Sequence, residues 1–166
     1  MRLRGADNRH MGPSDCMQAL RVLHVTPYGG DAWAYGGIPR LSDTMARGLA
    51  ARGHDVTVCT TDACDAHRRL EAPVGSRTRQ PWPPLRTGSN VELRVFPNIS
   101  NRLAYDPQCF LPVGLSGYLK RHAAAFDVAH LHACRNLPGV IAERHLRSAG
   151  VPYVLAPNGT APNLER

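Results

Sequence analysis

Two histidines at the end of one apolar run are the first residues in this sequence that could do chemistry. His130 and His132 alternate within "DVAHLHA" at 127–133, so in a strand both point to the same face, and His132 lies nearer the strand end. Ligands of parallel sheets bind at those ends. A neutral imidazole there can hydrogen-bond a ligand hydroxyl and orient it. His132 is therefore a candidate site residue, with a hydrogen-bonded core histidine as the alternative, and structural roles are predicted for His130 and for His24 in "RVLHV".

Two Tyr-Gly-Gly units follow the first apolar run, in "TPYGGDAWAYGGIPR" at 26–40. Gly36 and Gly37 stand directly before a helical pattern, where free backbone N–H groups favour an anion. We predict that this pair binds phosphate or substrate. The loop has neither the G-x-G-x-x-G spacing of a dinucleotide site nor the Gly-Lys-Ser/Thr of a P-loop. The alternative is that the pair only supplies a turn with positive φ.

Polar residues also follow other apolar runs. Asn158 and Gly159 end the last of them, and we predict that they bind substrate or phosphate. Asp62 follows the second run, where a dinucleotide-binding fold has its ribose-binding acid. The carboxyl ends of parallel strands share one edge of a sheet, so these residues, His132 and the glycine pair are expected on one rim.

Strands that alternate with helices must position these residues. Apolar, β-branched runs predict strands, and apolar residues at three- and four-residue steps predict helices. The strands are expected at 21–27, 54–61, 91–97, 127–133 and 152–159, and the helices between the glycine loop and Gly53, at 111–126 and at 136–149. This alternation predicts an α/β fold with a Rossmann-like, doubly wound parallel sheet.

The domain organisation follows from the same pattern. Residues 1–20 are polar and are expected to form a disordered or loosely ordered tail, and 21–166 one domain. The stretch 62–90 is rich in Pro and Arg and has no period, which predicts a long, mobile excursion from that domain.

Composition limits the class of protein. The 166 residues carry a formal net charge of +7, and no apolar run is long enough to cross a membrane. The five cysteines are odd in number and scattered, which favours reduced thiols in the cytoplasm. Cys59, Cys64 and His67 lack the spacing of a zinc motif, so no metal is expected. The arginines between 68 and 102 predict a solvated surface or, as the alternative, attraction to phosphorylated substrates or to the inner face of a membrane. No nucleic-acid motif accompanies them.

Three segments together resemble one enzyme family. "RVLHVTPYGG…YGGIPRLSDTMARGLAARGHDVTVCTT", "FDVAHLHA" and "VPYVLAPNGT" resemble the N-terminal domain of the retaining GT-B glycosyltransferases of family four, also called glycosyl transferase group 1. The resemblance runs from residue 21 to about 159. It implies the acceptor-side half of a two-domain enzyme, with the C-terminal donor domain absent. The chain by itself is then expected to be inactive.

The resemblance also implies substrates and site residues. The donor would be a nucleotide sugar and the acceptor a glycan, a lipid-linked molecule or a small molecule, with no cofactor or metal required. Gly36 and Gly37 would approach the donor diphosphate or the acceptor, and His132 would be a catalytic residue that faces the transferred sugar. Asn158 stands where many members of the family have His or Arg. In retaining transfer of this type the leaving phosphate accepts the acceptor's proton, so no carboxylate nucleophile is needed.

Two other classes of protein stay open at this point. One is a non-catalytic Rossmann-like binding module, and the other is an NAD-type oxidoreductase domain. Stoichiometric binding of NAD(H) would distinguish the second from a glycosyltransferase.

Overall fold

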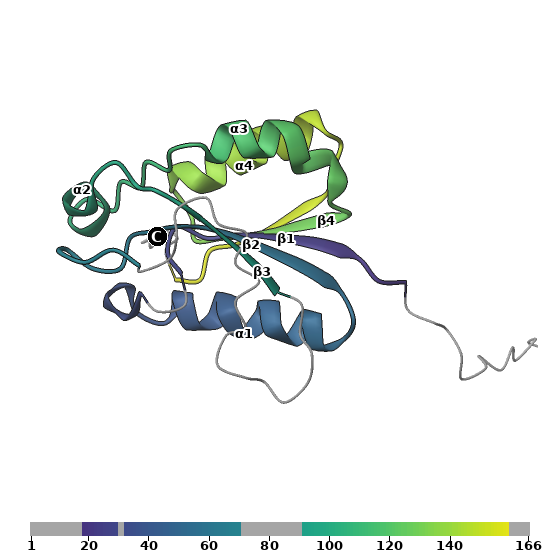
Figure 1. Cartoon of the computed structure of the whole chain (residues 1–166), viewed down its shortest axis with the longest axis horizontal. Coiled ribbons are helices and arrows are strands. Elements are labelled where there is room, and N and C mark those ends of the chain that lie inside the picture. Colours follow the sequence, from purple (N-terminus) through teal and green to yellow (C-terminus); the bar gives the residue numbers. More distant parts are fainter. Residues whose placement is uncertain (1–17, 30–31, 71–90, 160–166) are drawn as a thin grey trace, which may run out of the picture.

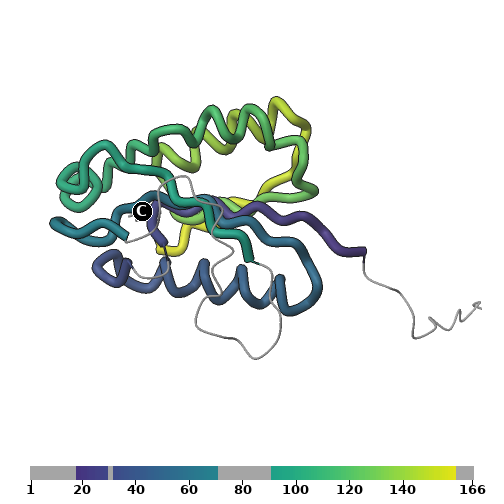
Figure 2. The backbone as a smooth tube through the Cα atoms, in the orientation of Figure 1, coloured from purple at the N-terminus to yellow at the C-terminus, as the bar shows by residue number. Residues whose placement is uncertain are grey.

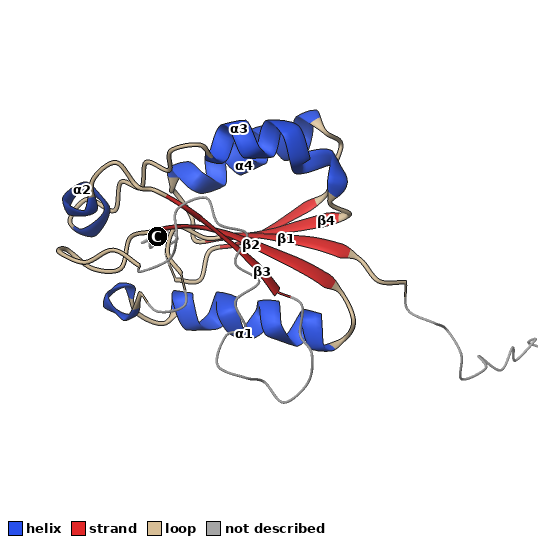
Figure 3. Cartoon of the chain, in the orientation of Figure 1, coloured by secondary structure: helices blue, strands red, loops and turns tan. Residues whose placement is uncertain are grey.

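The computed structural model describes residues 18–29, 32–70 and 91–159 (Figures 1 and 3). The strands are β1 (Arg21–Val25), β2 (Asp55–Thr61), β3 (Val91–Phe96), β4 (Val128–His132) and β5 (Tyr153–Ala156), and the α-helices are α1 (Ile38–Ala51), α2 (Asn101–Tyr105), α3 (Leu115–His122) and α4 (Leu137–Ser148). Every predicted strand and helix is present, with its ends shifted by a few residues. Helix α2 was not predicted, because five residues are too few to show a helical period. Most of the predicted tail, 1–17, lies outside the described residues.

The five strands form one parallel sheet in the order β3-β2-β1-β4-β5. Helix α1 lies against one face, and α3 and α4 lie against the other, as the course of the chain in Figure 2 shows. This arrangement confirms the predicted doubly wound α/β fold. The strand order reverses between β1 and β4, because the chain first builds outward through β2 and β3 and then returns to the other side of β1.

Alternate residues of the central strands enter two different cores. Leu23 and Val25 of β1 pack against α3 and α4. Val22 packs with Ala46 of α1 on the other face. Because successive side chains of a strand point to opposite faces, His24 shares the α1 face with Val22.

The loops at the carboxyl ends of the strands are held together by a third apolar cluster. Tyr28 stacks on Tyr35 with ring centroids 4.8 Å apart, and Phe110 meets Tyr28 edge-on at 5.5 Å. Ala104 of α2 belongs to the same cluster. The glycine loop is therefore packed against the α2 region, and the two segments form one end of the molecule (Figure 1).

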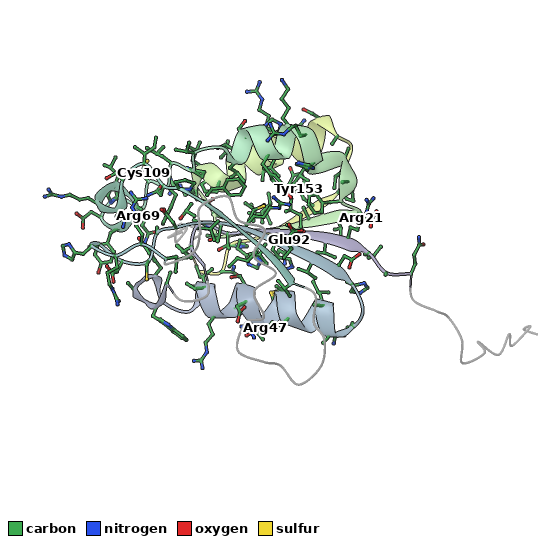
Figure 4. The ribbon with its side chains drawn as sticks, in the orientation of Figure 1. Arg21, Arg47, Arg69, Glu92, Cys109 and Tyr153 are labelled. Atoms are coloured by element: carbon green, nitrogen blue, oxygen red, sulfur yellow. The ribbon has the colours of Figure 1, made fainter. Side chains whose placement is uncertain are left out.

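The first part of the predicted excursion, 62–70, is tied to the domain. The buried Asp62 carboxylate accepts a hydrogen bond from the backbone N of Asn98 at 2.7 Å and pairs with Arg69 at 2.6 Å. Arg69 also donates to the backbone O of Asn98 at 2.7 Å. Figure 4 shows Arg69 at the loop end of the sheet and Arg21 at the opposite end. The prediction of a mobile excursion is therefore wrong for 62–70, and 71–90 lie outside the described residues.

Several arginines of the basic region have partners in the described residues. Arg68 pairs with Asp65 at 2.7 Å. Arg94 pairs with Glu92 at 2.6 Å, and its guanidinium lies 4.5 Å from the ring centroid of Tyr118. These side chains stabilise the domain locally. None of the described helices has the length and apolar character to span a membrane.

Candidate functional site

Three histidines meet where the strand order reverses. In doubly wound sheets the ligand crevice lies at this point, outside the carboxyl ends of the strands. His24 of β1 is paired with His130 of β4 in the sheet register. His132 ends β4 two residues later and points to the same face as His130. The fold therefore gathers the three imidazoles on the α1 face, beside the expected ligand crevice.

His24 and His132 are hydrogen-bonded to each other, with Nδ1 of His24 2.9 Å from Nε2 of His132. The ring centroid of His130 lies 5.2 Å from that of His24 and 4.2 Å from that of His132. His24 and His132 are both 0% exposed, whereas His130 is half-buried. His132 lies at the end of β4, as predicted, but it is fully buried there, because His24 of β1 and Asn158 of the turn after β5 lie against its side chain.

Burial holds the three imidazoles in their neutral form. Desolvation lowers the pKa of His24 to about 4 and that of His132 to about 3, and it also lowers the pKa of His130. Neighbouring histidines add to the first two shifts, because like charges at this distance repel. A neutral imidazole offers one donor and one acceptor. The cluster is therefore suited to a hydroxyl and does not present a positive charge to an anion.

The turn after β5 brings Asn158 to His132. Nδ2 of Asn158 lies 3.3 Å from Nδ1 of His132. The turn is left-handed at Asn158 (φ 50°) and Gly159 (φ 81°), a conformation that Asn and Gly adopt most readily. The structure thus places Asn158 and His132 in one site, as the shared edge of the strands predicted. A binding role for Gly159 stays a prediction.

The turn from β4 into α4 positions His132 and was not identified from the sequence. Ala133 (φ 63°) and Arg135 (φ 59°) are both left-handed, and such strain in non-glycine residues concentrates at functional sites. Asn136 stabilises this turn. Its Nδ2 donates to the backbone O of Ala133 at 2.9 Å and of His132 at 3.3 Å, and its Oδ1 accepts from the backbone N of Gly139 at 2.7 Å. An Asn before Leu-Pro is an N-cap signal that could have identified it.

Gly36 and Gly37 lie exposed at the start of α1. Gly36 has φ 82° and ψ −144°, a region that is essentially restricted to glycine, whereas Gly37 is the N-cap with an ordinary φ of −83°. A Cβ built on either residue meets nothing within 4 Å. The described backbone hydrogen bonds of the pair reach Trp33 and Leu41, not His132. The space above them is open to a ligand, and their binding role stays a prediction.

The two glycines are expected to respond differently to alanine. Gly36→Ala should cost about 1–3 kcal/mol of stability, because alanine does not tolerate that backbone conformation. Gly37→Ala should be neutral or stabilise by up to about 1 kcal/mol. Urea denaturation of the two variants and the wild type measures both effects. A loss of ligand binding in Gly37→Ala would then report contact with the ligand, whereas equal destabilisation by both changes would contradict the assigned conformations.

The glycine and the acidic residue that a dinucleotide site needs are not free to bind a ligand in the described residues. Gly29 is buried, and a Cβ there would lie 2.8 Å from Cδ1 of Leu70, so this glycine serves packing. The carboxylate of Asp62, the candidate ribose ligand, is engaged by Arg69 of its own loop and by the backbone N of Asn98, which follows β3. The NAD-type alternative is therefore not favoured.

The three histidines also form the one group in the described residues that could hold a metal ion, since their ligand atoms lie within 4.8 Å of one another. Neutral imidazoles are good zinc ligands. However, nitrogens of His24 and His132 are already hydrogen-bonded to each other at 2.9 Å, and a metal would have to displace that proton. The group also includes no carboxylate from the described residues.

The sheet order defines a Rossmann-like α/β domain, in which a ligand is expected to bind next to the reversal between β1 and β4. Residues 36–165 match the family model of the glycosyl transferase 4-like domain. The match covers well over half of the chain, so the chain belongs to this family. Its function is accordingly of the glycosyltransferase type, as the resemblance of the three sequence segments implied.

The other comparisons add little. Among curated proteins no match was found. One similar solved structure is the C-terminal domain of a hydrogenase from Pyrococcus furiosus, with 12% identity, a TM-score of 0.42, and coverage of 81% of this chain and 89% of that one. Another is the E. coli tRNA N6-threonylcarbamoyladenosine dehydratase TcdA in complex with AMP, with 18% identity, a TM-score of 0.36, and coverage of 82% and 49%. Neither likeness bears on function.

Proposed function

We propose that this chain is the acceptor-binding N-terminal domain of a retaining glycosyltransferase that uses a nucleotide-sugar donor. The observation that carries the proposal is His132, a buried neutral imidazole at the end of β4, next to the reversal in strand order. The resemblance implies that this residue faces the transferred sugar. Family membership supports sugar transfer in general, and retention and the nature of the donor are our extension of it.

The site residues would each serve transfer without a covalent intermediate. His132 would hydrogen-bond a hydroxyl of the transferred sugar and orient it. The exposed start of α1 at Gly36 and Gly37 would face the donor diphosphate, since a helix N-terminus favours negative charge. The bond to the leaving phosphate would break as the acceptor oxygen attacks from the same face, and that phosphate would take the acceptor's proton. No metal ion or carboxylate nucleophile takes part in this scheme.

The acceptor in this proposal is a glycan, a lipid-linked molecule or a small molecule, and the cytoplasm is the expected compartment. Attachment to the inner face of a membrane is a separate proposal. It would rest mainly on arginines outside the described residues, because Arg68, Arg69 and Arg94 are ion-paired within the domain.

Titration of the chain by NMR tests the proposed site. UDP-glucose and methyl glucoside serve as probes of nucleotide-sugar and hydroxyl binding. We expect shifts of the amide signals of Gly36 and Gly37 with the nucleotide sugar, and of Asn158 and Gly159 with either probe. Calorimetry with NAD(H) is expected to show no stoichiometric binding. Stoichiometric NAD(H) binding would establish the dinucleotide-binding class instead, and shifts confined to residues outside this end of the sheet would contradict the assigned site.

A further inference from the structure

A chain of hydrogen bonds determines which ring nitrogen of His132 carries the proton. The Nδ2 group of Asn158 can only donate, so Nδ1 of His132, 3.3 Å away, must accept. The proton of the neutral His132 ring is then on Nε2, which lies 2.9 Å from Nδ1 of His24. His24 must therefore accept at Nδ1 and carry its own proton on Nε2. Asn158 therefore donates a hydrogen bond to His132, and His132 donates one to His24.

We propose that His24 is a positioning residue for His132. By accepting the Nε2–H proton, His24 holds His132 in the tautomer whose Nδ1 is a hydrogen-bond acceptor. That nitrogen then takes a ligand group that donates, such as a sugar hydroxyl, and rejects a phosphate oxygen, which has no proton to give. This inference rests on the proposed function, because the hydroxyl is that of the transferred sugar.

Asn158 is the hydrogen-bond partner of His132 that a ligand can replace. Its amide occupies Nδ1 of His132, so a sugar hydroxyl must replace it on that nitrogen. Asn158 lies half-buried in a left-handed turn just after β5, whereas His24 is fully buried inside β1. The outer partner of His132 is therefore the exchangeable one, and the inner partner is fixed by the sheet.

The free-energy cost of burying His24 supports a positioning role for this residue over a packing role. Its Nε2 atom is buried and has no hydrogen-bond partner among the described residues. An unpaired buried N–H group is unfavourable by roughly 1–3 kcal/mol. The neighbouring inward positions on the α1 face, Val22 and Val58, are filled by apolar side chains without that cost. Nε2 of His130 is unpaired as well, but of these two histidines only His24 is hydrogen-bonded to His132 and supplies the acceptor that its Nε2–H group needs.

The tautomer can be measured directly on the 166-residue chain labelled with ¹⁵N-histidine. Protonated and unprotonated ring nitrogens have well-separated ¹⁵N shifts, and their couplings to the ring hydrogens assign Nδ1 and Nε2. We expect His132 to be wholly in the Nε2–H form, with that proton protected from exchange. A His132 ring protonated on Nδ1 would overturn the proposal. The measurement needs no substrate, so absence of sugar binding would contradict the proposed function and leave this result standing.

Two replacements of His24 and one matched control complete the test. His24→Leu removes the acceptor, and we expect the single tautomer of His132 to be lost to a mixture. His24→Asn places an amide oxygen close to the former Nδ1 and should restore the Nε2–H form. His130→Leu removes the other histidine whose ring lies against His132, and it should leave the tautomer unchanged.

Three outcomes would overturn the proposal: an unchanged tautomer in His24→Leu, loss of the Nε2–H form in His24→Asn, or the same loss in His130→Leu. If His24→Leu fails to fold, His24→Asn and His130→Leu still test the proposed tautomer of His132. Titration with Zn²⁺ alone is a further check. Tight one-to-one binding that shifts the signals of all three histidines would overturn the proposal, because the metal would replace the proton between His24 and His132.

Discussion

His132→Ala is expected to lower the free energy of unfolding by about 2–4 kcal/mol. His132 is 0% exposed, so alanine leaves a cavity. The change also removes the hydrogen-bond partner of His24 and that of Asn158. The sequence places His132 at the end of a strand and does not show that it is buried. Urea denaturation at pH 7 measures the effect, and an unfolding free energy within about 0.5 kcal/mol of the wild type would contradict the buried arrangement.

In the two-domain transferase of the proposed function, the same change is expected to lower kcat by roughly 10- to 1000-fold, the range for loss of one positioned polar group near a transition state. Destabilisation alone does not explain such a loss while the enzyme stays folded. Leu119→Ala is the matched control, since Leu119 is also 0% exposed but lies in the core against the other face of the sheet. We expect Leu119→Ala to destabilise by a similar amount and to retain kcat. Equal losses of kcat in the two variants would show that His132 is only a packing residue.

The second large effect is loss of stability in mild acid. The pKa values of His24 and His132 are lowered to about 4 and about 3 in the folded chain, against about 6.5 in an unfolded one. Below pH 6.5 the unfolded state therefore binds protons that the folded state does not bind. Stability falls as the pH drops from 6.5 towards 4, with a slope that approaches about 1.4 kcal/mol per pH unit for each histidine.

Between pH 7 and pH 5 the two histidines together should cost about 4 kcal/mol of stability. Chemical denaturation at closely spaced pH values measures this slope. His24→Leu removes one of the titrating groups and should lower the slope by up to about 1.4 kcal/mol per pH unit. A flat profile between pH 7 and 5 would show that the folded chain protonates these imidazoles as readily as the unfolded one, and the buried, neutral cluster would then be wrong.

Most of the fold could be predicted from the sequence, because its signals are local. Runs such as "RVLHV" and the apolar steps before Gly53 each report one element through its own periodicity. Their alternation requires crossovers and hence a parallel sheet, which brings the carboxyl ends of the strands to one edge. For that reason His132 and Asn158 could be placed in one site without coordinates. Helix α2 could not be predicted, because it is short and packs through Ala104 onto distant loops.

Contacts between distant parts of the chain were decided only by the tertiary structure. The partner of His132 is His24, 108 residues away, and only the register of β1 against β4 sets them side by side. Asp62 is bonded to Asn98 and Arg69 by the way its loop folds. The sequence by itself determined which side chains reach the end of the sheet. Burial, backbone conformation and strand register decided which of them touch, because these depend on the whole packed chain.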